Sequence, residues 1–392
     1  MQSFHPPERL LLGPGPSEVP ARVRLALARP TLGHLDPAFL RLMDEVRDAL
    51  RRLFRAPDHL CLPLPGPGTA GMEAAMLNLL EPGDTAVIAV NGVFGERMAQ
   101  MAERAGAEVV RVEHAWGEPV DRARCEAALW ARGAKVFGFV QAETSTGVLS
   151  DAAALCALAA EHGALSVVDC VTSLGGLPVA GGEWGADVLY SGTQKCLSAP
   201  PGLAPFALGP RARDAVRARK VPPRTWLYDL GLLLSYWEGA AGATRAYHHT
   251  APVNALYGLH EALVALFEEG LEVSWRRHAR AHAALAAGVE ALGLALPVAA
   301  AVRLPMLNVV AAPEGVDEAA VRARMLERFG VEIGGGLGPS KGKVWRIGLM
   351  GASATPRHVL AGLAALGDAL AAVLPDVRVQ DALDAAEASL AV

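Results

Sequence analysis

Ser166-Val167-Val168-Asp169 is a short apolar run that ends on a carboxylate. It predicts a buried strand, and in an open α/β sheet the carboxyl ends of the strands face the ligand-binding cleft. The run Tyr190-Ser191-Gly192-Thr193-Gln194-Lys195 follows, so that a lysine stands 26 positions after the aspartate. We therefore expect Asp169 and Lys195 at one edge of the sheet. The spacing alone also allows Asp169 to cap a loop and Lys195 to be an exposed turn residue.

Lysine is scarce in this chain, which makes Lys195 informative. Of 36 basic residues only five are lysines, at positions 135, 195, 220, 341 and 343. A lysine amine can form an imine or lose its proton where its surroundings lower its pKa, whereas arginine can do neither near neutral pH. A carboxylate such as Asp169 could keep a pyridine nitrogen protonated. The pair therefore predicts a Schiff-base lysine with a pyridinium partner.

The pattern around these residues predicts an α/β fold. An amphipathic helix is expected at 36–54, and short β-rich runs then alternate with helical ones up to residue 208. This alternation is typical of a sheet covered by helices on both faces. The expected strands are 85–90, 108–112, 136–140, 165–169, 188–190 and 205–208, and the expected helices between them are 98–105, 125–131 and 151–161.

A smaller α+β domain is predicted at the C-terminal end. Residues 253–291 are mostly helical with an interruption at Gly270, and the tail from Pro375 is helical or frayed. We predict an N-terminal arm at 1–18, a large domain at 19–268 and a small domain at 269–392. The small domain is expected to hold strands at 306–310 and 344–347 and helices at 317–329 and 356–373.

Composition indicates a cytoplasmic protein that binds small molecules and other subunits. The 392 residues carry a net charge of −5, which gives no sign of a nucleic-acid surface. No apolar segment reaches the roughly 18 to 20 residues that span a bilayer, and the N-terminus lacks a signal-peptide pattern. The cysteines form no Cys-x-x-Cys pair, so we predict neither disulfides nor a metal site. They stand at positions 61, 125, 156, 170 and 196.

One glycine-rich turn could bind an anion. The segment Gly66-Pro67-Gly68-Thr69-Ala70-Gly71 has the glycine spacing of a dinucleotide fingerprint. However, Pro63 and Pro65 stand where the regular strand of such a fingerprint would donate hydrogen bonds. We favour free amides of Gly68, Thr69 and Ala70 at a helix N-terminus that hold a phosphate monoester. A simple tight turn is the alternative, and 338–343 is read as a turn because it lacks the Walker residues.

Several motifs together resemble the alanine–glyoxylate and serine–pyruvate aminotransferases, which are class V, fold-type I enzymes dependent on pyridoxal 5′-phosphate (PLP). They match in order from about residue 10 to about residue 370. The motifs are Leu11-Leu12-Gly13-Pro14-Gly15-Pro16-Ser17, the Gly68-Thr69-Ala70 helix start, Glu143-Thr144-Ser145-Thr146-Gly147, Val168-Asp169, Ser191-Gly192-Thr193-Gln194-Lys195, Tyr247-His248-His249-Thr250 and Gly335-Gly336-Leu337-Gly338-Pro339-Ser340. The resemblance implies a mostly parallel, seven-stranded sheet between helices, followed by the smaller α+β domain.

The resemblance also implies roles for residues at the PLP ring. Lys195 would form the internal aldimine and later carry the proton between substrate Cα and cofactor C4′. Asp169 would pair with the pyridine nitrogen, and Val171 would pack on the ring. Thr144 would place a hydroxyl near the phenolic oxygen, with Ser145 as the second candidate.

Further roles concern the phosphate, the substrate and the second subunit. Gln194 would join Gly68, Thr69 and Ala70 around the phosphate, and Tyr247 and Thr250 would reach the phosphate of the neighbouring subunit in a homodimer. Gly15 and Arg346 would bind the substrate, with the arginine gripping its carboxylate through a bidentate fork.

Two residues depart from the animal enzymes of this family, and both bear on the amino-acid preference. Phe94 stands where a tryptophan usually stacks on the ring, and Thr69 replaces a histidine.

The implied activity is ping-pong transamination from alanine or serine to glyoxylate or pyruvate. Alternatives within the fold are β-elimination, a desulfurase, or transamination of a larger substrate. A desulfurase needs a mobile nucleophilic cysteine, which the sequence does not indicate. From another class, a nicotinamide-dependent dehydrogenase is supported only by the glycine spacing of 66–71. A catalytically idle homologue is disfavoured because Lys195, Asp169 and Arg346 are all present.

Overall fold

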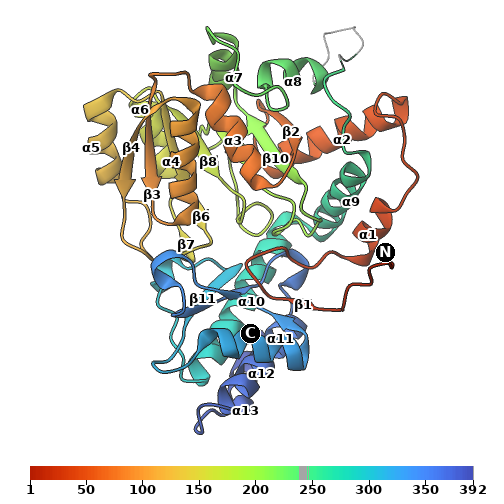
Figure 1. Cartoon of the computed structure of the whole chain (residues 1–392), viewed down its shortest axis with the longest axis vertical. Coiled ribbons are helices and arrows are strands. Elements are labelled where there is room, and N and C mark those ends of the chain that lie inside the picture. The colour runs from red at the N-terminus through yellow and green to blue at the C-terminus, as the bar shows by residue number, and fades with distance from the viewer. Residues whose placement is uncertain (238–244, 246, 392) are drawn as a thin grey trace.

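The computed structural model describes residues 1–237, 245 and 247–391. Two parts are visible in Figure 1: a larger one that holds the main sheet, and a smaller one formed by the C-terminal residues. The N-terminal segment runs between them, and β1 (Leu10–Leu11) lies against the smaller part.

The larger part is built on a seven-stranded sheet in the order β2-β10-β9-β8-β5-β3-β4. The strands from β9 to β4 are parallel, whereas β10 is antiparallel to both of its neighbours. The prediction of a mostly parallel sheet is therefore confirmed. The strands are β2 (Leu60–Pro65), β3 (Thr85–Val90), β4 (Glu108–Glu113), β5 (Val136–Val140), β8 (Leu165–Asp169), β9 (Val188–Tyr190) and β10 (Leu203–Leu208).

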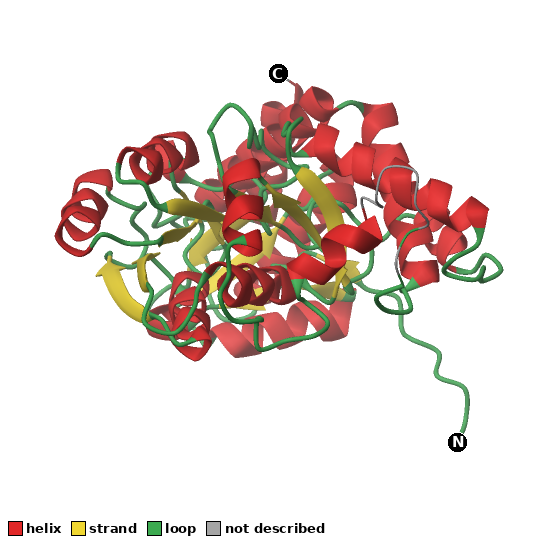
Figure 2. Ribbon diagram, turned by 90° about the horizontal axis from the view of Figure 1, so that it is seen from above, coloured by secondary structure: helices red, strands yellow, loops and turns green. Residues whose placement is uncertain are grey.

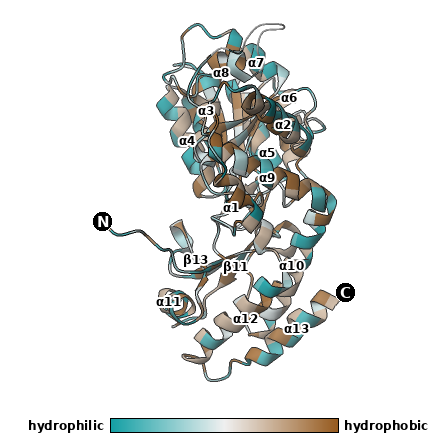
Figure 3. Cartoon of the chain, turned by 90° about the vertical axis from the view of Figure 1, so that its right-hand side faces the viewer, coloured by the Kyte–Doolittle hydropathy of each residue, from teal (hydrophilic) through white to brown (hydrophobic). Residues whose placement is uncertain are grey.

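Helices cover both faces of this sheet, as the view from above in Figure 2 shows. Central strands such as β5 and β8 are buried along their whole length, which explains their continuous apolar sequences. Figure 3 shows the resulting hydrophobic interior between helices with hydrophilic outer faces. The helices of this part are α1 (Ala21–Leu27), α2 (Pro37–Leu53), α3 (Gly68–Leu79), α4 (Val93–Ala105), α5 (Arg122–Arg132), α6 (Ala152–Glu161), α7 (Pro210–Arg217), α8 (Leu230–Trp237) and α9 (Val253–Glu269).

A strand precedes the glycine-rich turn despite its two prolines. Pro63 and Pro65 both lie in β2, which pairs only with β10 and forms one edge of the sheet. Proline is tolerated there because an edge strand needs hydrogen-bond donors on one side only. The expectation that these prolines exclude a regular strand is therefore wrong. The strand is nevertheless not the parallel β-strand that a dinucleotide fingerprint follows.

The C-terminal part has its own core, which runs from Ala281 to Leu390 and includes Leu12 of the N-terminal segment. The main core runs from Ala26 to Leu266. The domain limits at 18/19 and 268/269 stay a prediction. This part contains α10 (Leu271–Ala291), β11 (Leu307–Ala311), α11 (Glu318–Phe329), β12 (Val331–Glu332), β13 (Gly334–Gly335), β14 (Val344–Gly348), α12 (Pro356–Ala371), α13 (Val379–Ala391) and the 3₁₀ turns 300–302, 338–340 and 351–353.

The start of α4 and a short hairpin are among the elements that differ from the sequence-based expectation. Helix α4 begins at Val93, five residues before the expected start at Met98. A small hairpin of β6 (Ala142–Glu143) and β7 (Val148–Leu149) follows β5 and was not expected. Within the described residues, every helix is too short or too polar to cross a membrane.

Candidate active site

A cavity of about 150 Å³ lies where the carboxyl ends of the parallel strands meet helices α3 and α4. Eight of the residues predicted for the site line it. Its walls are formed by Gly68, Thr69, Met72, Phe94, Arg97, Val140, Ala142, Thr144, Asp169, Val171, Thr172, Gln194 and Lys195.

Lys195 is held by the N-terminal segment. Its Nζ donates a hydrogen bond to the carbonyl oxygen of Pro14. A Cβ at Gly15 would lie 2.7 Å from the same Nζ, and Gly15 has a φ of +104°, so glycine is required by both space and backbone. Burial, with a smaller contribution from the guanidinium of Arg346, lowers the pKa of Lys195 to about 8. The amine is therefore accessible to deprotonation near neutral pH.

Asp169 lies at the end of β8 and is only 3% exposed. Its Oδ1 accepts a hydrogen bond from the amide of Val171, and its Oδ2 accepts one from the Tyr190 hydroxyl, both at 2.8 Å. Burial raises the pKa of Asp169 to about 7, although both hydrogen bonds oppose this shift. A cationic partner in the cavity would favour the ionised carboxylate.

The glycine-rich turn places an uncapped helix N-terminus on the cavity. Pro67 is the N-cap of α3 and supplies no side-chain hydrogen bond, while Gly68 and Thr69 line the cavity. A Cβ on Gly68 would lie 2.5 Å from Val171, so only glycine fits here. The prediction that the Ala70 amide is also free is wrong. That amide donates to the Pro67 carbonyl oxygen at 2.7 Å because the first turn is tight.

Gln194 completes this side of the cavity. Its Oε1 is buried without a hydrogen-bond partner among the described residues. A buried polar amide without a partner is costly. The side chain is therefore suited to a polar ligand in the cavity.

Arg97 was not predicted from the sequence, but it lines the cavity next to Phe94. Its guanidinium lies 4.8 Å from the centre of the Phe94 ring and donates to the Thr69 hydroxyl at 3.3 Å. Helical spacing was the available signal, because residues three apart on a helix share a face. Met72 and Thr172 also line the cavity and were not predicted.

Buried Glu143 organises the wall that carries Phe94. Its Oε2 accepts from the amides of Phe94 and Gly95 at 3.1 and 3.3 Å, which satisfies the first turn of α4. Its Oε1 accepts from the Ser145 hydroxyl at 2.6 Å, and this hydroxyl in turn accepts from the amide of Val93 at 2.9 Å. Of the two predicted hydroxyl residues, Thr144 therefore lines the cavity, whereas Ser145 braces the start of α4.

Arg346 comes from strand β14 and is 7% exposed. Its Nε donates to the Gly335 carbonyl oxygen at 2.7 Å and its Nη1 to that of Thr144 at 3.2 Å. Burial lowers the pKa of Arg346, and Glu143 opposes this shift. Among the described residues, no ion pair is formed by this guanidinium, so it has capacity for an external carboxylate.

Tyr247 and Thr250 lie away from the cavity of their own chain. Tyr247 is 60% exposed and Thr250 is also exposed. Their hydroxyls lie 3.3 Å apart. The structure thus leaves both side chains on the surface.

The cavity combines the features that PLP requires: a buried lysine, a buried carboxylate and an uncapped helix N-terminus for a phosphate. Fold and site together define a PLP-dependent enzyme of fold type I.

Comparisons with known proteins agree with this class. The family model "Aminotransferase class-V" matches residues 24–342. The alanine–glyoxylate aminotransferase of Callithrix jacchus is 41% identical over 93% of this chain and 88% of that protein. The chain belongs to the class V aminotransferases.

Two solved structures are also similar. One is the ureidoglycine–glyoxylate aminotransferase of Bacillus subtilis, with a TM-score of 0.96, 36% identity and all of both chains covered. The other is an alanine–glyoxylate aminotransferase from Nostoc sp., with a TM-score of 0.92, 42% identity, and 94% of this chain and 97% of that chain covered.

Proposed function

We propose that this aminotransferase moves the amino group of a small amino acid, alanine or serine, to a small 2-oxo acid, glyoxylate or pyruvate. The observation that carries this proposal is the presence of Lys195 and Asp169 in one cavity beside the uncapped start of α3. The names of the similar proteins support glyoxylate as the acceptor, since alanine–glyoxylate and ureidoglycine–glyoxylate aminotransferases share it. The two half-reactions would follow each other in a ping-pong order.

The start of α3 would hold the phosphate of PLP. The amides of Gly68 and Thr69 would donate to it, aided by the positive end of the helix dipole. Ala70, whose amide donates to Pro67, would stabilise the turn that presents these two amides, and Gln194 would offer the NH₂ group of its side-chain amide from the same side of the cavity. Arg97 would add a positive charge next to Thr69.

The ring of PLP would lie against the apolar wall of the cavity. Val171 and Phe94 would pack on the ring, and Arg97 would support Phe94 through its cation–π contact. Asp169 would accept a hydrogen bond from the protonated pyridine nitrogen. Thr144 would place its hydroxyl near the phenolic oxygen. When bound, the cofactor supplies an electron sink for the pair left at the substrate Cα.

Lys195 would act twice. Its Nζ would first hold the cofactor covalently. Once the substrate amine has taken its place, Nζ would carry the proton between the substrate Cα and C4′ of the cofactor. A pKa of about 8 suits this task, because a proton carrier works best near the operating pH.

Arg346 and Gly15 would orient the substrate. The guanidinium would bind the substrate carboxylate through the donors that Gly335 and Thr144 leave available. The backbone at Gly15 passes directly beside Lys195 and would limit the space for the substrate. Small side chains would therefore be preferred.

The working unit would be a homodimer. Tyr247 and Thr250 would reach the phosphate of the neighbouring site, which accords with their exposure in one chain. We also assign the protein to the cytoplasm. Its five cysteines are all free and buried, as expected in a reducing compartment.

A second candidate donor is ureidoglycine. The ureidoglycine–glyoxylate aminotransferase of Bacillus subtilis superposes on this chain with a TM-score of 0.96, and the match covers all of both chains. A panel of amino donors against glyoxylate and pyruvate, compared by kcat/KM, would test both candidates. Alanine or serine with glyoxylate should rank highest under the main proposal. A higher value for (S)-ureidoglycine would establish the second. Saturable NADH binding without PLP binding would contradict both.

A further inference from the structure

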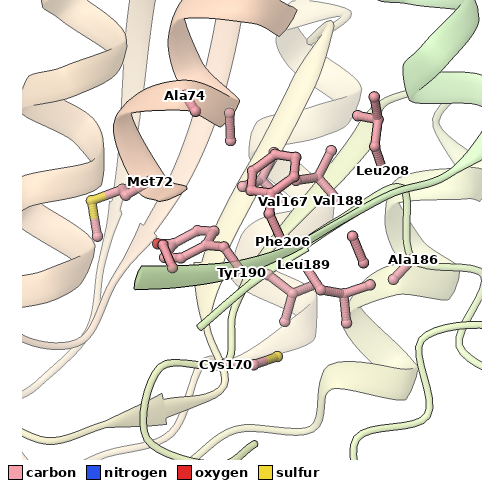
Figure 4. Packing of buried hydrophobic residues seen from close by; sticks show 14 of the residues in the cluster. Met72, Ala74, Val167, Cys170, Ala186, Val188, Leu189, Tyr190, Phe206 and Leu208 are labelled. Atoms are coloured by element: carbon pink, nitrogen blue, oxygen red, sulfur yellow. The ribbon is translucent and has the colours of Figure 1, made fainter. Parts of the chain in front are cut away.

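Tyr190 occupies an unusual position for a phenol. Its side chain is 0% exposed and lies in the main core near Met72, Leu189 and Phe206, as Figure 4 shows. A buried tyrosine needs a hydrogen-bond partner for its hydroxyl, because an unsatisfied polar group in a core is costly. The partner identifies what this tyrosine does.

The partner is the carboxylate of Asp169. Strands β8 and β9 are parallel, and Asp169 is the register partner of Tyr190. The Tyr190 hydroxyl donates to Oδ2 of Asp169 at 2.8 Å. The amide of Val171 occupies Oδ1, so the two donors fix the plane of the carboxylate.

The ring of Tyr190 also supports the phosphate-side helix. A Cβ at Gly71 would lie 2.8 Å from the Cβ and 3.1 Å from the Cγ of Tyr190. Helix α3 therefore packs directly on this side chain. Tyr190 thus contacts both the carboxylate and the helix whose start lines the cavity.

We propose that Tyr190 is a positioning residue for Asp169. Its hydroxyl orients the carboxylate toward the ring nitrogen of the cofactor and sets the basicity of that carboxylate. This inference rests on the proposed function, in which Asp169 pairs with that nitrogen. The phenol would stabilise the ionised carboxylate and so keep the shared proton on the ring nitrogen rather than on Asp169. Tyr190 itself would touch neither substrate nor cofactor.

The surroundings of Asp169 explain why such a donor is needed. Burial raises the pKa of Asp169, and the buried carboxylate of Glu143 raises it further, whereas Lys195 opposes the rise. The thiol of Cys170 is also nearby, but burial raises its pKa, so it stays neutral. Burial likewise raises the pKa of Tyr190, so the phenol remains a donor at every working pH.

The test compares the binding of two ligands to Tyr190→Phe. One is PLP, and the other is its carbon analogue, in which CH replaces the ring nitrogen. If the pKa of Asp169 rises by about one unit without the phenol, PLP should bind about tenfold more weakly at neutral pH. The analogue favours a protonated Asp169, so it should bind Tyr190→Phe as tightly as the wild type or more tightly. A loss of affinity is therefore expected for PLP and not for the analogue.

Tyr236→Phe is the matched control. Tyr236 is also 0% exposed, but its hydroxyl has no hydrogen-bond partner among the described residues. This variant should bind both ligands like the wild type. Equal weakening of both ligands in Tyr190→Phe would show a packing role only and overturn the inference.

Asp169→Asn separates this inference from the proposed function. If Asp169→Asn loses PLP affinity but Tyr190→Phe does not, the role of Tyr190 is rejected and that of Asp169 stands. If Asp169→Asn binds PLP as well as the wild type, the assignment of Asp169 fails and the inference fails with it.

Discussion

At the scale of single residues, the site depends on ionisable groups that are kept from water. Lys195 and Asp169 are both buried, and their pKa values are shifted toward each other, to about 8 and about 7. Each group would be more stable in water without a ligand. Burial of these two groups therefore destabilises the folded protein, as is common for ionisable residues at functional sites.

The cost of burying Lys195 predicts a pH dependence of stability. Its pKa falls from 10.5 in the unfolded chain to about 8 in the folded one, so between these values the unfolded state binds more protons. Stability of the cofactor-free protein should then rise with pH by roughly 3 kcal/mol from this group. Thermal unfolding of the wild type and Lys195→Met from about pH 7.5 to about pH 10.5 would measure it. As the pH rises, the stability of the wild type should increase relative to that of Lys195→Met. A stability difference between the two proteins that does not change with pH would refute the lowered pKa of Lys195.

Arg346 should govern the affinity for the substrate carboxylate. Removal of a charged hydrogen-bonding partner costs about 1.5 to 3 kcal/mol, so Arg346→Ala should raise KM for alanine roughly ten- to a hundredfold. Arg324→Ala is a suitable control, because Arg324 in the same part of the chain pairs with Asp368 on the surface. A KM that changes equally in both variants, or in neither, would argue against the assignment of Arg346.

At the scale of elements, helix α4 depends on a residue distant in sequence. Its N-cap, Gly92, has no side chain, and the carboxylate of Glu143 binds the first amides instead. The same carboxylate fixes Ser145. One buried group thereby connects the start of α4, the wall at Phe94 and the loop after β6.

Glu143→Gln should disturb both stability and cofactor binding. An amide has one acceptor oxygen where the carboxylate has two, so either the α4 amides or the Ser145 amide loses its partner, at a cost of about 1 to 3 kcal/mol. Phe94 would shift, and PLP affinity should fall, as equilibrium titration would show.

Asp317→Ala provides the comparison, because Asp317 caps α11 far from the cavity. It should lower the thermal midpoint without changing PLP affinity. A Glu143→Gln protein with normal PLP affinity would show that Glu143 only stabilises the helix.

Some of these elements could be predicted from local sequence patterns, and others could not. The alternation of strands and helices follows from local periodicity, and Asp169 and Lys195 line one cavity because the carboxyl ends of parallel strands lie at one edge of the sheet. The start of α4 was missed because its cap comes from Glu143, about fifty residues away, and no local pattern carries that information. Likewise, the edge position of β2 and the bond from Tyr190 to Asp169 depend on strand order and register, which emerge only in three dimensions.

At the scale of the whole molecule, the site unites segments from both parts of the chain. Leu10 and Leu11 pair with β12, and the Leu12 carbonyl oxygen accepts from the amide of Gly348 at 2.8 Å. A few residues later, the Ser17 hydroxyl donates to the carbonyl oxygen of Lys195 at 2.6 Å. The N-terminal segment therefore connects the C-terminal part to the lysine loop.

The proposed dimer predicts complementation between two inactive proteins. One variant is Lys195→Ala, and the other combines Tyr247→Ala with Thr250→Ala. In a mixed dimer one site regains both sets of residues, so random mixing should restore about a quarter of wild-type activity. Light scattering and native mass spectrometry would verify that mixed dimers form. If they form and stay inactive, Tyr247 and Thr250 do not serve the neighbouring site.

Lys195 is the residue proposed to hold the cofactor, and the scarcity of lysine allows a direct test of this role. The protein saturated with PLP would be reduced with sodium borohydride, which fixes a lysine–cofactor linkage, and its peptides would be mapped by mass spectrometry. With only five lysines in the chain, each can be examined individually. We predict a stoichiometric pyridoxyl group on Lys195 and none on the other four lysines. A label on another lysine, or no label at all, would contradict it.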